Sequence, residues 1–213
     1  HYAVRHRPNA LRFAPSLIIM VKEPVAGRVK TRLARVTGTT AATAFMRTNL
    51  ALTIQRLARD PRWQTLLCVA PDAACSSRMF ADHVVRIPQG RGDLGQRMAR
   101  ASEPARHAGP VVIIGADIPA IRPSDIAAAF RTLLRADAVF GPAGDGGYWL
   151  VGLAPRRRAR PPFANVRWSS PHALSDTIAN LRGRRLAFVT QKQDIDEAVD
   201  LKRLAPLAQR LII

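Results

Sequence analysis

The stretches Leu17-Ile18-Ile19-Met20-Val21 and Val111-Val112-Ile113-Ile114-Gly115 decide the fold class of this chain. Both are apolar without interruption and rich in β-branched residues. A strand with one solvated face would instead alternate between apolar and polar residues. Continuous runs of this length are typical of strands that are buried on both faces of a parallel sheet. The two stretches therefore predict a parallel sheet that is covered by helices on both sides.

Further apolar runs of strand length occur elsewhere in the sequence. Between most of them lie stretches whose apolar residues have helical spacing. This alternation predicts an α/β fold with an open, doubly wound sheet. The predicted strands are residues 17–21, 66–70, 84–87, 111–115, 138–140, 148–153 and 186–190. The predicted helices are residues 40–59, 73–81, 94–106, 124–135, 171–181 and 197–210.

One connection breaks the alternation. The strands predicted at residues 138–140 and 148–153 are joined by Gly141-Pro142-Ala143-Gly144-Asp145-Gly146-Gly147, which is too short for a crossover helix. We therefore expect the second strand to turn back antiparallel or to enter a different layer, which gives a mixed, mostly parallel sheet. No internal repeat or low-complexity linker divides the chain, so we expect one domain over residues 16–213 after an extension over residues 1–15.

Composition excludes several classes of protein. The 213 residues are 47% apolar and 23% charged, which is typical of a globular chain and not of a disordered or fibrous one. No apolar run approaches the roughly 20 residues of a membrane span. The two cysteines, Cys68 and Cys75, are too few for a disulfide framework and lack the spacing of a zinc site. We expect reduced thiols in a cytoplasmic protein.

The net charge of +18 would attract phosphates, nucleic acid or anionic lipid. Because 29 of the basic residues are arginines scattered mostly along helical segments, solvated helix faces explain most of this excess better than a nucleic-acid surface does. Lysines are rare, yet two of the four, Lys22 and Lys30, lie within nine residues of each other. This local clustering indicates a specific role.

Ligands in open α/β sheets bind outside the carboxyl ends of the strands, so the residues that follow each strand are of interest. After the first strand, Pro24 and Gly27 favour a loop whose backbone N–H groups can turn toward an anion, while Lys22, Lys30 and Arg32 add positive charge. This pattern predicts a phosphate-binding loop, with a basic surface loop as the alternative. It is neither a Walker A nor a GxGxxG motif, so it does not indicate an ATPase or a dinucleotide site.

Carboxylates follow the later strands. Asp117, in Gly115-Ala116-Asp117-Ile118-Pro119, could hold a divalent cation or merely bond to turn amides. Asp194 and Asp196 could cap the last helix or supply a second metal ligand. Asp145 lies in Asp145-Gly146-Gly147-Tyr148-Trp149, which could be a simple Asp-Gly hairpin or could bring a carboxylate and a stacking face to a ligand.

Two further stretches are typical of helix starts. Asp93, in Gly92-Asp93-Leu94-Gly95-Gln96-Arg97-Met98, is a candidate N-cap. In Trp168-Ser169-Ser170-Pro171, Ser170 is the expected cap and Pro171 the expected first helical residue.

The motifs are more specific together than alone, since they occur in one order over residues 17–204. They are Lys22-x-Pro24-x-x-Gly27-x-x-Lys30-Thr31-Arg32-Leu33, Gly92-Asp93-Leu94-Gly95-x-Arg97-Met98, Gly115-x-Asp117-Ile118-Pro119, Asp145-Gly146-Gly147-Tyr148-Trp149-Leu150-x-Gly152-Leu153, Trp168-Ser169 and Asp194-x-Asp196. This combination resembles the bacterial selenodomain-associated transferase family, which belongs to the nucleotide-diphospho-sugar transferases of the GT-A fold. It is similar, more distantly, to phospholactate and molybdopterin guanylyltransferases.

The resemblance implies roles for individual residues. It implies contacts to the nucleotide and its phosphates by Lys22, Gly27, Lys30, Thr31, Arg32, Asp93, Leu94, Gly95 and Arg97. It implies acceptor contacts by Gly146, Gly147, Tyr148, Trp149, Trp168 and Ser169, and a Mg²⁺ or Mn²⁺ site at Asp117 with Asp196 or Asp194. We expect Asp145 and Lys30 to be the catalytic residues, since a carboxylate beside a metal-bound diphosphate could accept the acceptor's proton. The family usually has Thr-Pro-Glu-Asp after its last aspartate, whereas Glu197-Ala198-Val199-Asp200 stands here, which leaves the second metal ligand open.

We therefore expect a glycosyltransferase that moves a sugar from a nucleoside diphosphate sugar to a small acceptor. A divalent ion and fixed cations would stabilise the leaving diphosphate, and Asp145 would accept the acceptor's proton. One alternative is a nucleotidyltransferase, which would bind a nucleoside triphosphate and release pyrophosphate; the lysine-bearing loop suits this chemistry too. A second alternative is a nucleic-acid-binding module, but the basic loop lacks interleaved aromatic residues, so we do not expect nucleic acid as the partner.

Overall fold

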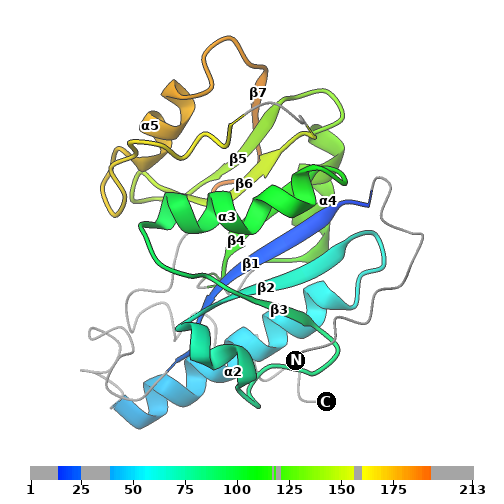
Figure 1. The fold of residues 1–213 in the computed structure, drawn as a ribbon, viewed down its shortest axis with the longest axis vertical. Coiled ribbons are helices and arrows are strands. Elements are labelled where there is room, and N and C mark those ends of the chain that lie inside the picture. The colour runs from blue at the N-terminus through cyan, green and yellow to red at the C-terminus, as the bar shows by residue number, and fades with distance from the viewer. Residues whose placement is uncertain (1–13, 25–38, 117, 119–120, 156–159, 193–213) are drawn as a thin grey trace.

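A computed structural model describes residues 14–24, 39–116, 118, 121–155 and 160–192 of the chain (Figure 1). A single mixed sheet lies at its centre. The strands are β1 (Ser16–Lys22), β2 (Gln64–Ala70), β3 (Val85–Pro88), β4 (Val111–Gly115), β5 (Ala138–Pro142), β6 (Tyr148–Leu153) and β7 (Leu186–Phe188). The helices are α2 (Thr39–Ala58), the 3₁₀ helix η1 (Asp72–Ser76), α3 (Leu94–Arg106), α4 (Pro123–Thr132) and α5 (Ala173–Ala179).

The strands follow the order β3-β2-β1-β4-β6-β5-β7 across the sheet. Strand β6 pairs antiparallel with both β4 and β5, whereas every other neighbouring pair is parallel. The predicted mixed, mostly parallel α/β sheet is therefore confirmed. The reversal of β6 is confirmed as well, because the seven-residue connection before it cannot hold a crossover helix.

The two faces of the sheet carry separate apolar clusters. Leu17, Ile19 and Val21 point to the face covered by α2 and α4, and Ile18 points to the face covered by α3 and α5 (Figure 1). All four side chains are fully buried. Successive residues of β1 thus enter different cores, which explains why the run is apolar without alternation.

The helix predicted after β2, over residues 73–81, is wrong beyond its first turn. The 3₁₀ helix η1 stops because Ser77 adopts extended backbone (φ −65°, ψ 134°). The Ser77 hydroxyl donates to Glu23 Oε1 (2.5 Å), and the Arg86 guanidinium in β3 donates to the carbonyl oxygens of Cys75 (2.9 Å) and Ser77 (3.2 Å). The carbonyl groups that a longer helix would use are therefore bonded to a side chain from the sheet.

The expected start of α5 is also corrected. Ser170 is not its N-cap and Pro171 is not its first residue, because α5 begins at Ala173 with His172 as the flanking residue. The Ser170 hydroxyl instead donates to the Arg167 carbonyl oxygen (2.6 Å) and accepts from the His172 N–H (3.2 Å). These bonds close a turn ahead of the helix.

The helix predicted over residues 197–210 lies outside the described residues, as does most of the expected extension over residues 1–15. In the part of the chain that the structure describes, no helix is both long and apolar enough to cross a membrane. Cys68 and Cys75 are free thiols, and burial raises the pKa of Cys68 to about 11.

Candidate functional site

The sheet topology determines where a ligand site is expected. From β1 the chain proceeds to β2 on one side, and it later returns to β4 on the other side of β1. The carboxyl ends of β1 and β4 therefore flank the point where the strand order reverses, which is the usual ligand crevice of open α/β sheets. Because β6 is antiparallel to β4, its first residue, Tyr148, lies at this same edge.

A hollow of about 200 Å³ opens at this edge. Its walls come from the ends of β1 and β4, the first half of α3, the β5–β6 turn and the segment before α5. The lining residues are Met20, Leu94, Met98, Ile113, Ile114, Gly115, Ala143, Asp145, Gly147, Tyr148, Trp149, Val151, Trp168 and Ala173. The structure thus brings together six of the predicted site residues in one hollow, namely Leu94, Asp145, Gly147, Tyr148, Trp149 and Trp168.

The loop over residues 89–93, which we call the polar loop, links β3 to α3 beside this edge. Buried Gln89 anchors it, since its side-chain N–H₂ donates to the carbonyl oxygens of Val21 (3.0 Å) and Cys68 (2.9 Å). Arg100 in α3 donates to the carbonyl oxygens of Gln89 (2.6 Å) and Arg91 (2.9 Å). The loop is therefore bonded both to the sheet and to the helix that follows it.

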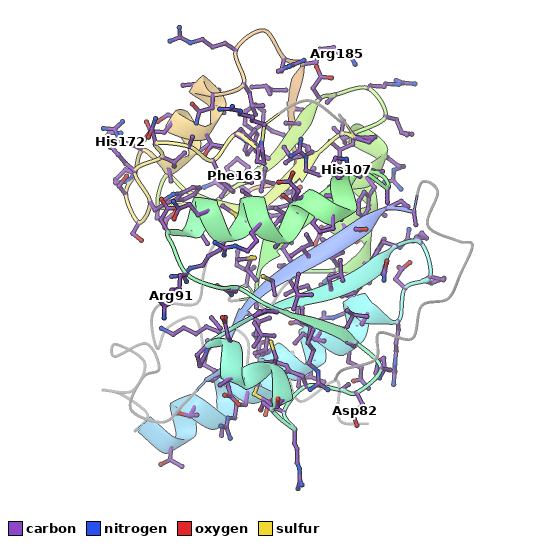
Figure 2. The ribbon with its side chains drawn as sticks, in the orientation of Figure 1. Asp82, Arg91, His107, Phe163, His172 and Arg185 are labelled. Atoms are coloured by element: carbon purple, nitrogen blue, oxygen red, sulfur yellow. The ribbon has the colours of Figure 1, made fainter. Side chains whose placement is uncertain are left out.

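Arg91 in the polar loop and His172 before α5 lie on the side of the molecule where α3 begins (Figure 2). His107 lies on the opposite side, where α3 ends (Figure 2). The polar loop and the start of α5 therefore belong to one edge of the molecule, the edge that carries the hollow.

Asp93 and Arg97 have well-defined local partners. Asp93 is the N-cap of α3, as predicted, because its carboxylate accepts from the Gln96 backbone N–H (2.8 Å). Arg97 donates through Nε to the Gly92 carbonyl oxygen (2.8 Å) and through Nη1 to Gln89 Oε1 (3.4 Å). Capping and loop bonding account for both side chains in this structure.

Gly95 in α3 is required by helix packing. A Cβ atom at this position would lie 2.5 Å from the carbonyl oxygen of Phe163 and 2.7 Å from Cζ2 of Trp168. Such contacts are too short for any side chain. The glycine therefore lets α3 approach the segment that carries Trp168, which places that indole against the hollow.

The turn between β5 and β6 brings Asp145 to the hollow. The turn is closed by a bond from the Ala143 N–H to the Gly147 carbonyl oxygen (3.0 Å), and Asp145 Oδ1 accepts from the Gly147 N–H (2.9 Å). Gly146 has φ +85°, and a Cβ there would collide with the backbone of Pro171. The hairpin interpretation is therefore confirmed, and the hairpin presents an exposed carboxylate at the hollow.

The three aromatic residues at the hollow differ in their surroundings. Tyr148 lies edge-to-face against Trp168 (centroids 6.3 Å apart, 71° between planes). Trp149 is only 3% exposed, belongs to the core on the α2 and α4 side, and donates through its indole N–H to the Thr190 carbonyl oxygen (3.0 Å). The rings of Tyr148 and Trp168 are therefore better placed than Trp149 to contact a ligand. Ser169, beside Trp168, has left-handed backbone (φ 55°) and is exposed.

Of the residues predicted to bind phosphate or metal through the loop after β1 and the later carboxylates, only Lys22 lies in the part of the chain that the structure describes. Lys22 is exposed at the carboxyl end of β1, two residues after Met20, so it projects from the same face of the sheet as that lining residue. The remaining predicted contacts lie outside the described residues, namely Gly27, Lys30, Thr31, Arg32, Asp117, Asp194 and Asp196. Within the described ranges, no group of three or more His, Cys, Asp or Glu side chains could hold a metal ion.

Neither Gln89 nor Arg100 was predicted as a site residue from the sequence. A polar residue directly after β3 and before a glycine was the available signal for Gln89, since the carboxyl ends of strands are where such sites form. Its burial could not be inferred, because the same residue after a strand can equally point to solvent.

Solved structures with a similar fold indicate the fold class of this chain. The first is a Desulfovibrio desulfuricans G20 protein assigned as a nucleotide-diphospho-sugar transferase, with 28% identity, coverage of 89% of this chain and 85% of that chain, and a TM-score of 0.80. CMP:2-keto-3-deoxy-manno-octonic acid synthetase complexed with CTP shares the fold (12% identity, 92% and 99% coverage, TM-score 0.56). Molybdopterin-guanine dinucleotide biosynthesis protein A from Archaeoglobus fulgidus does so as well (15% identity, 92% and 99% coverage, TM-score 0.54).

The chain therefore has the fold of the nucleotide-diphospho-sugar transferases, as the resemblance implied. It belongs to the bacterial family described as "Uncharacterized protein conserved in bacteria (DUF2064)", whose model matches residues 53–170. No curated protein matches the sequence significantly.

Proposed function

We propose that this protein is a metal-dependent glycosyltransferase that moves a sugar from a nucleoside diphosphate sugar to the hydroxyl group of a small acceptor. The observation that carries the proposal is the hollow at the β1–β4 reversal point, where the Asp145 carboxylate adjoins the rings of Tyr148 and Trp168. A volume of about 200 Å³ suits one small reactant better than a whole nucleotide sugar, because pockets for larger ligands usually span about 300–1,000 Å³.

The donor is assigned to the region of β1 and the polar loop. Lys22 supplies positive charge at the end of β1, and Gly27, Lys30, Thr31 and Arg32 are the proposed phosphate contacts next to it in sequence. Asp117 with Asp196 or Asp194 would hold Mg²⁺ or Mn²⁺, since a set of carboxylate oxygens suits a hard cation. Such an ion would neutralise charge on the diphosphate.

Asp145 is the proposed general base. Its Oδ1 is oriented by the Gly147 N–H (2.9 Å), and within the described part of the chain its carboxylate forms no ion pair. The acceptor oxygen would attack the anomeric carbon while the bond from that carbon to the diphosphate oxygen breaks. The hydroxyl proton would pass to Asp145, and the nucleoside diphosphate would leave.

Nucleotidyl transfer is the second candidate. Two of the proteins that share the fold have names that refer to CMP or guanine dinucleotide products, and one is described in complex with CTP. The lysines of the loop after β1 would then neutralise a departing pyrophosphate, after attack at the α-phosphorus of a nucleoside triphosphate.

Product analysis separates the two reactions. The protein is incubated with Mn²⁺ and either nucleoside diphosphate sugars or nucleoside triphosphates, each with a panel of alcohols and phosphorylated acceptors. The proposal predicts release of a nucleoside diphosphate from a nucleotide sugar. Pyrophosphate release from triphosphates, with no consumption of any nucleotide sugar, would reject glycosyl transfer in favour of the second candidate.

Replacing Asp145 tests its role as the base. Asp145→Asn is expected to lower kcat roughly 100-fold or more, since general-base catalysis contributes about 10²–10⁴ in rate. Asp82→Asn is the control, because Asp82 is an exposed carboxylate that pairs with Arg86 (2.9 Å) and does not line the hollow; Figure 2 labels its position. An unchanged kcat in Asp145→Asn would remove Asp145 from the reaction.

Asp117→Asn tests the proposed metal site in the same way. Titration calorimetry is expected to show weaker Mn²⁺-dependent binding of a nucleoside diphosphate, with an unchanged melting temperature. Unchanged metal-dependent affinity would exclude Asp117 as a ligand.

A further inference from the structure

We infer that the hollow recognises an apolar group, so that the acceptor is a neutral alcohol with an aromatic or branched aliphatic body and not a sugar or a phosphorylated compound. This inference rests on the proposed function, and it names the chemical class of the acceptor. It follows from the direction in which the polar ends of the aromatic side chains point, from the apolar mouth of the hollow, and from the sign of the charge on its wall.

The Tyr148 hydroxyl is bonded away from the hollow. It lies 3.2 Å from Thr177 Oγ1, in α5. The Thr177 hydroxyl donates its one hydrogen to the Ala173 carbonyl oxygen (2.8 Å), so the Tyr148 hydroxyl must be the donor between the two. Thr177 is fully buried, and burial also raises the pKa of Tyr148. The hydroxyl is thus held inside the protein, and Tyr148 contributes ring carbon to the wall.

Trp168 likewise contributes ring surface. Its indole N–H is buried from solvent and has no hydrogen-bond partner in the described structure. The ring packs against Phe163 (centroids 6.4 Å apart) and edge-to-face against Tyr148. With the Trp149 N–H bonded to the Thr190 carbonyl oxygen, no aromatic side chain at the hollow offers its polar atom to a ligand.

Apolar side chains complete the wall and its mouth. Met20 and Met98 line the hollow with flexible thioethers, which adapt to apolar and aromatic ligands. Leu94, the first residue of α3, lines it too and is 41% exposed, although most large apolar residues here are buried. An apolar ligand in the hollow would cover Leu94, which gives this exposed side chain a function.

The charge of the wall opposes an anionic acceptor. The whole chain carries +18, yet among the described residues that line the hollow the one charged side chain is the carboxylate of Asp145. A phosphate bound there would meet a like charge. A sugar would bury several hydroxyl groups against carbon, and each unpaired hydroxyl would weaken binding.

The size of the hollow agrees with this class. Apolar cavities of about 150 Å³ hold one benzene ring, so about 200 Å³ accommodates a single-ring or branched alcohol with its hydroxyl toward Asp145. The carboxylate that would accept the proton is thus also the polar group that would fix the orientation of the alcohol.

Direct binding tests the inference without any turnover. Calorimetry on the intact protein compares benzyl alcohol, phenyl phosphate and glucose. We expect millimolar or tighter binding of benzyl alcohol and at least tenfold weaker binding of the other two. Tighter or equal binding of phenyl phosphate or glucose that is lost in Trp168→Ala, or no binding of benzyl alcohol, would overturn the inference.

Variants of Trp168 locate the binding in the hollow. Trp168→Ala is expected to weaken benzyl alcohol binding at least tenfold, whereas Trp168→Phe, which keeps a ring but no N–H, should lose less than threefold. The control Leu134→Ala, at an exposed leucine remote from the hollow, should bind as the wild type does. Melting temperatures report whether each variant folds; equal loss in Trp168→Phe and Trp168→Ala would contradict ring recognition.

Failure of the proposed function is a separate outcome. If benzyl alcohol binds as expected but no nucleotide sugar is consumed with any acceptor, the hollow is apolar and the glycosyltransferase proposal is wrong. If a nucleotide sugar is consumed with phosphorylated acceptors alone, the proposed function stands and the acceptor class is wrong.

Discussion

The polar loop and the aromatic wall of Tyr148, Phe163 and Trp168 lie at the same edge of the sheet but are held by different forces. Directional hydrogen bonds from Gln89 and Arg100 fix the backbone of the polar loop. Ring contacts and glycine close approaches fix the aromatic wall. Under the proposed function, the hydrogen-bonded polar loop would support the charged donor, and the aromatic wall would contact the neutral acceptor.

The largest loss in the free energy of unfolding is expected next to the aromatic wall, at the turn that carries Asp145. Gly146→Ala forces a side chain into left-handed backbone (φ +85°) and places Cβ 2.6 Å from the Pro171 Cα. We expect a loss of about 3 kcal/mol in the free energy of unfolding, since such strain and overpacking cost roughly 1–3 kcal/mol each.

Urea denaturation measures this loss against a matched control. Gly183 also has positive φ (+74°), but a methyl group added there would stand in open space, with no atom within 4 Å. Gly183→Ala should therefore cost only about 1–2 kcal/mol, the penalty for left-handed backbone alone. Equal losses in the two variants would show that contact with Pro171 contributes nothing.

The next largest loss in the free energy of unfolding is expected in the polar loop. Gln89→Ala leaves the Val21 and Cys68 carbonyl oxygens without the side-chain donor that bonds them. We expect a loss of about 2 kcal/mol, since buried polar groups left unsatisfied cost roughly 1–3 kcal/mol. Gln64→Ala, at an exposed glutamine of β2, should change stability by less than about 0.5 kcal/mol. Similar effects of both substitutions in urea denaturation would contradict the role given to Gln89.

How much of the fold and of the candidate site can be predicted from the sequence depends on the kind of interaction that forms each feature. The runs in β1 and β4 were informative because burial on both faces removes polar residues from a strand. The reversal of β6 followed from the length of its connection alone. These features depend on residues that are neighbours in the chain, so the pattern predicted them correctly.

Contacts between distant segments could not be predicted in this way. Gly95 was assigned to the nucleotide through the resemblance, yet in the structure it is explained by the approach of Phe163, far along the chain. The helix predicted after β2 was wrong because Arg86, in the next strand, bonds the carbonyl groups of that segment. Composition and spacing do not encode these tertiary partners.

A smaller effect is expected at the contact between α3 and the aromatic wall. In Gly95→Ala, the higher helix propensity of alanine stabilises the folded state by about 1 kcal/mol. The added methyl group would crowd Phe163 and Trp168, which destabilises it by roughly 1–3 kcal/mol. We expect a net loss of about 1 kcal/mol in urea denaturation, together with weaker binding of benzyl alcohol because Trp168 is displaced. Unchanged binding would indicate that the position of Trp168 does not depend on this contact.

The smallest expected effect is a pH dependence of stability at the Arg167–Asp176 pair, next to the aromatic wall. The Arg167 guanidinium and backbone N–H both bond the Asp176 carboxylate and hold its pKa well below the usual range. The depressed pKa means that this stabilisation is present above about pH 4 and is lost as the pH falls through the folded-state pKa. The melting temperature of Asp176→Asn should therefore lie below that of the wild type at pH 7, and the difference should shrink toward pH 2.

A double-variant comparison checks the cause of this dependence. Arg167→Leu should show the same pH trend with a smaller loss, because the Arg167 backbone N–H still bonds Asp176. Combining it with Asp176→Asn should add little, since the two substitutions disrupt one interaction. Fully additive losses would contradict the assignment of the shifted pKa to Arg167.

The central claim is that the donor and the acceptor meet at the carboxyl ends of β1 and β4. A crystal structure of the protein with a nucleoside diphosphate sugar and Mn²⁺ tests it most directly. We predict electron density for the diphosphate beside Lys22, with the sugar directed toward Asp145. Density for the nucleotide elsewhere, for example in the arginine-lined groove between α4 and β7, would contradict the account.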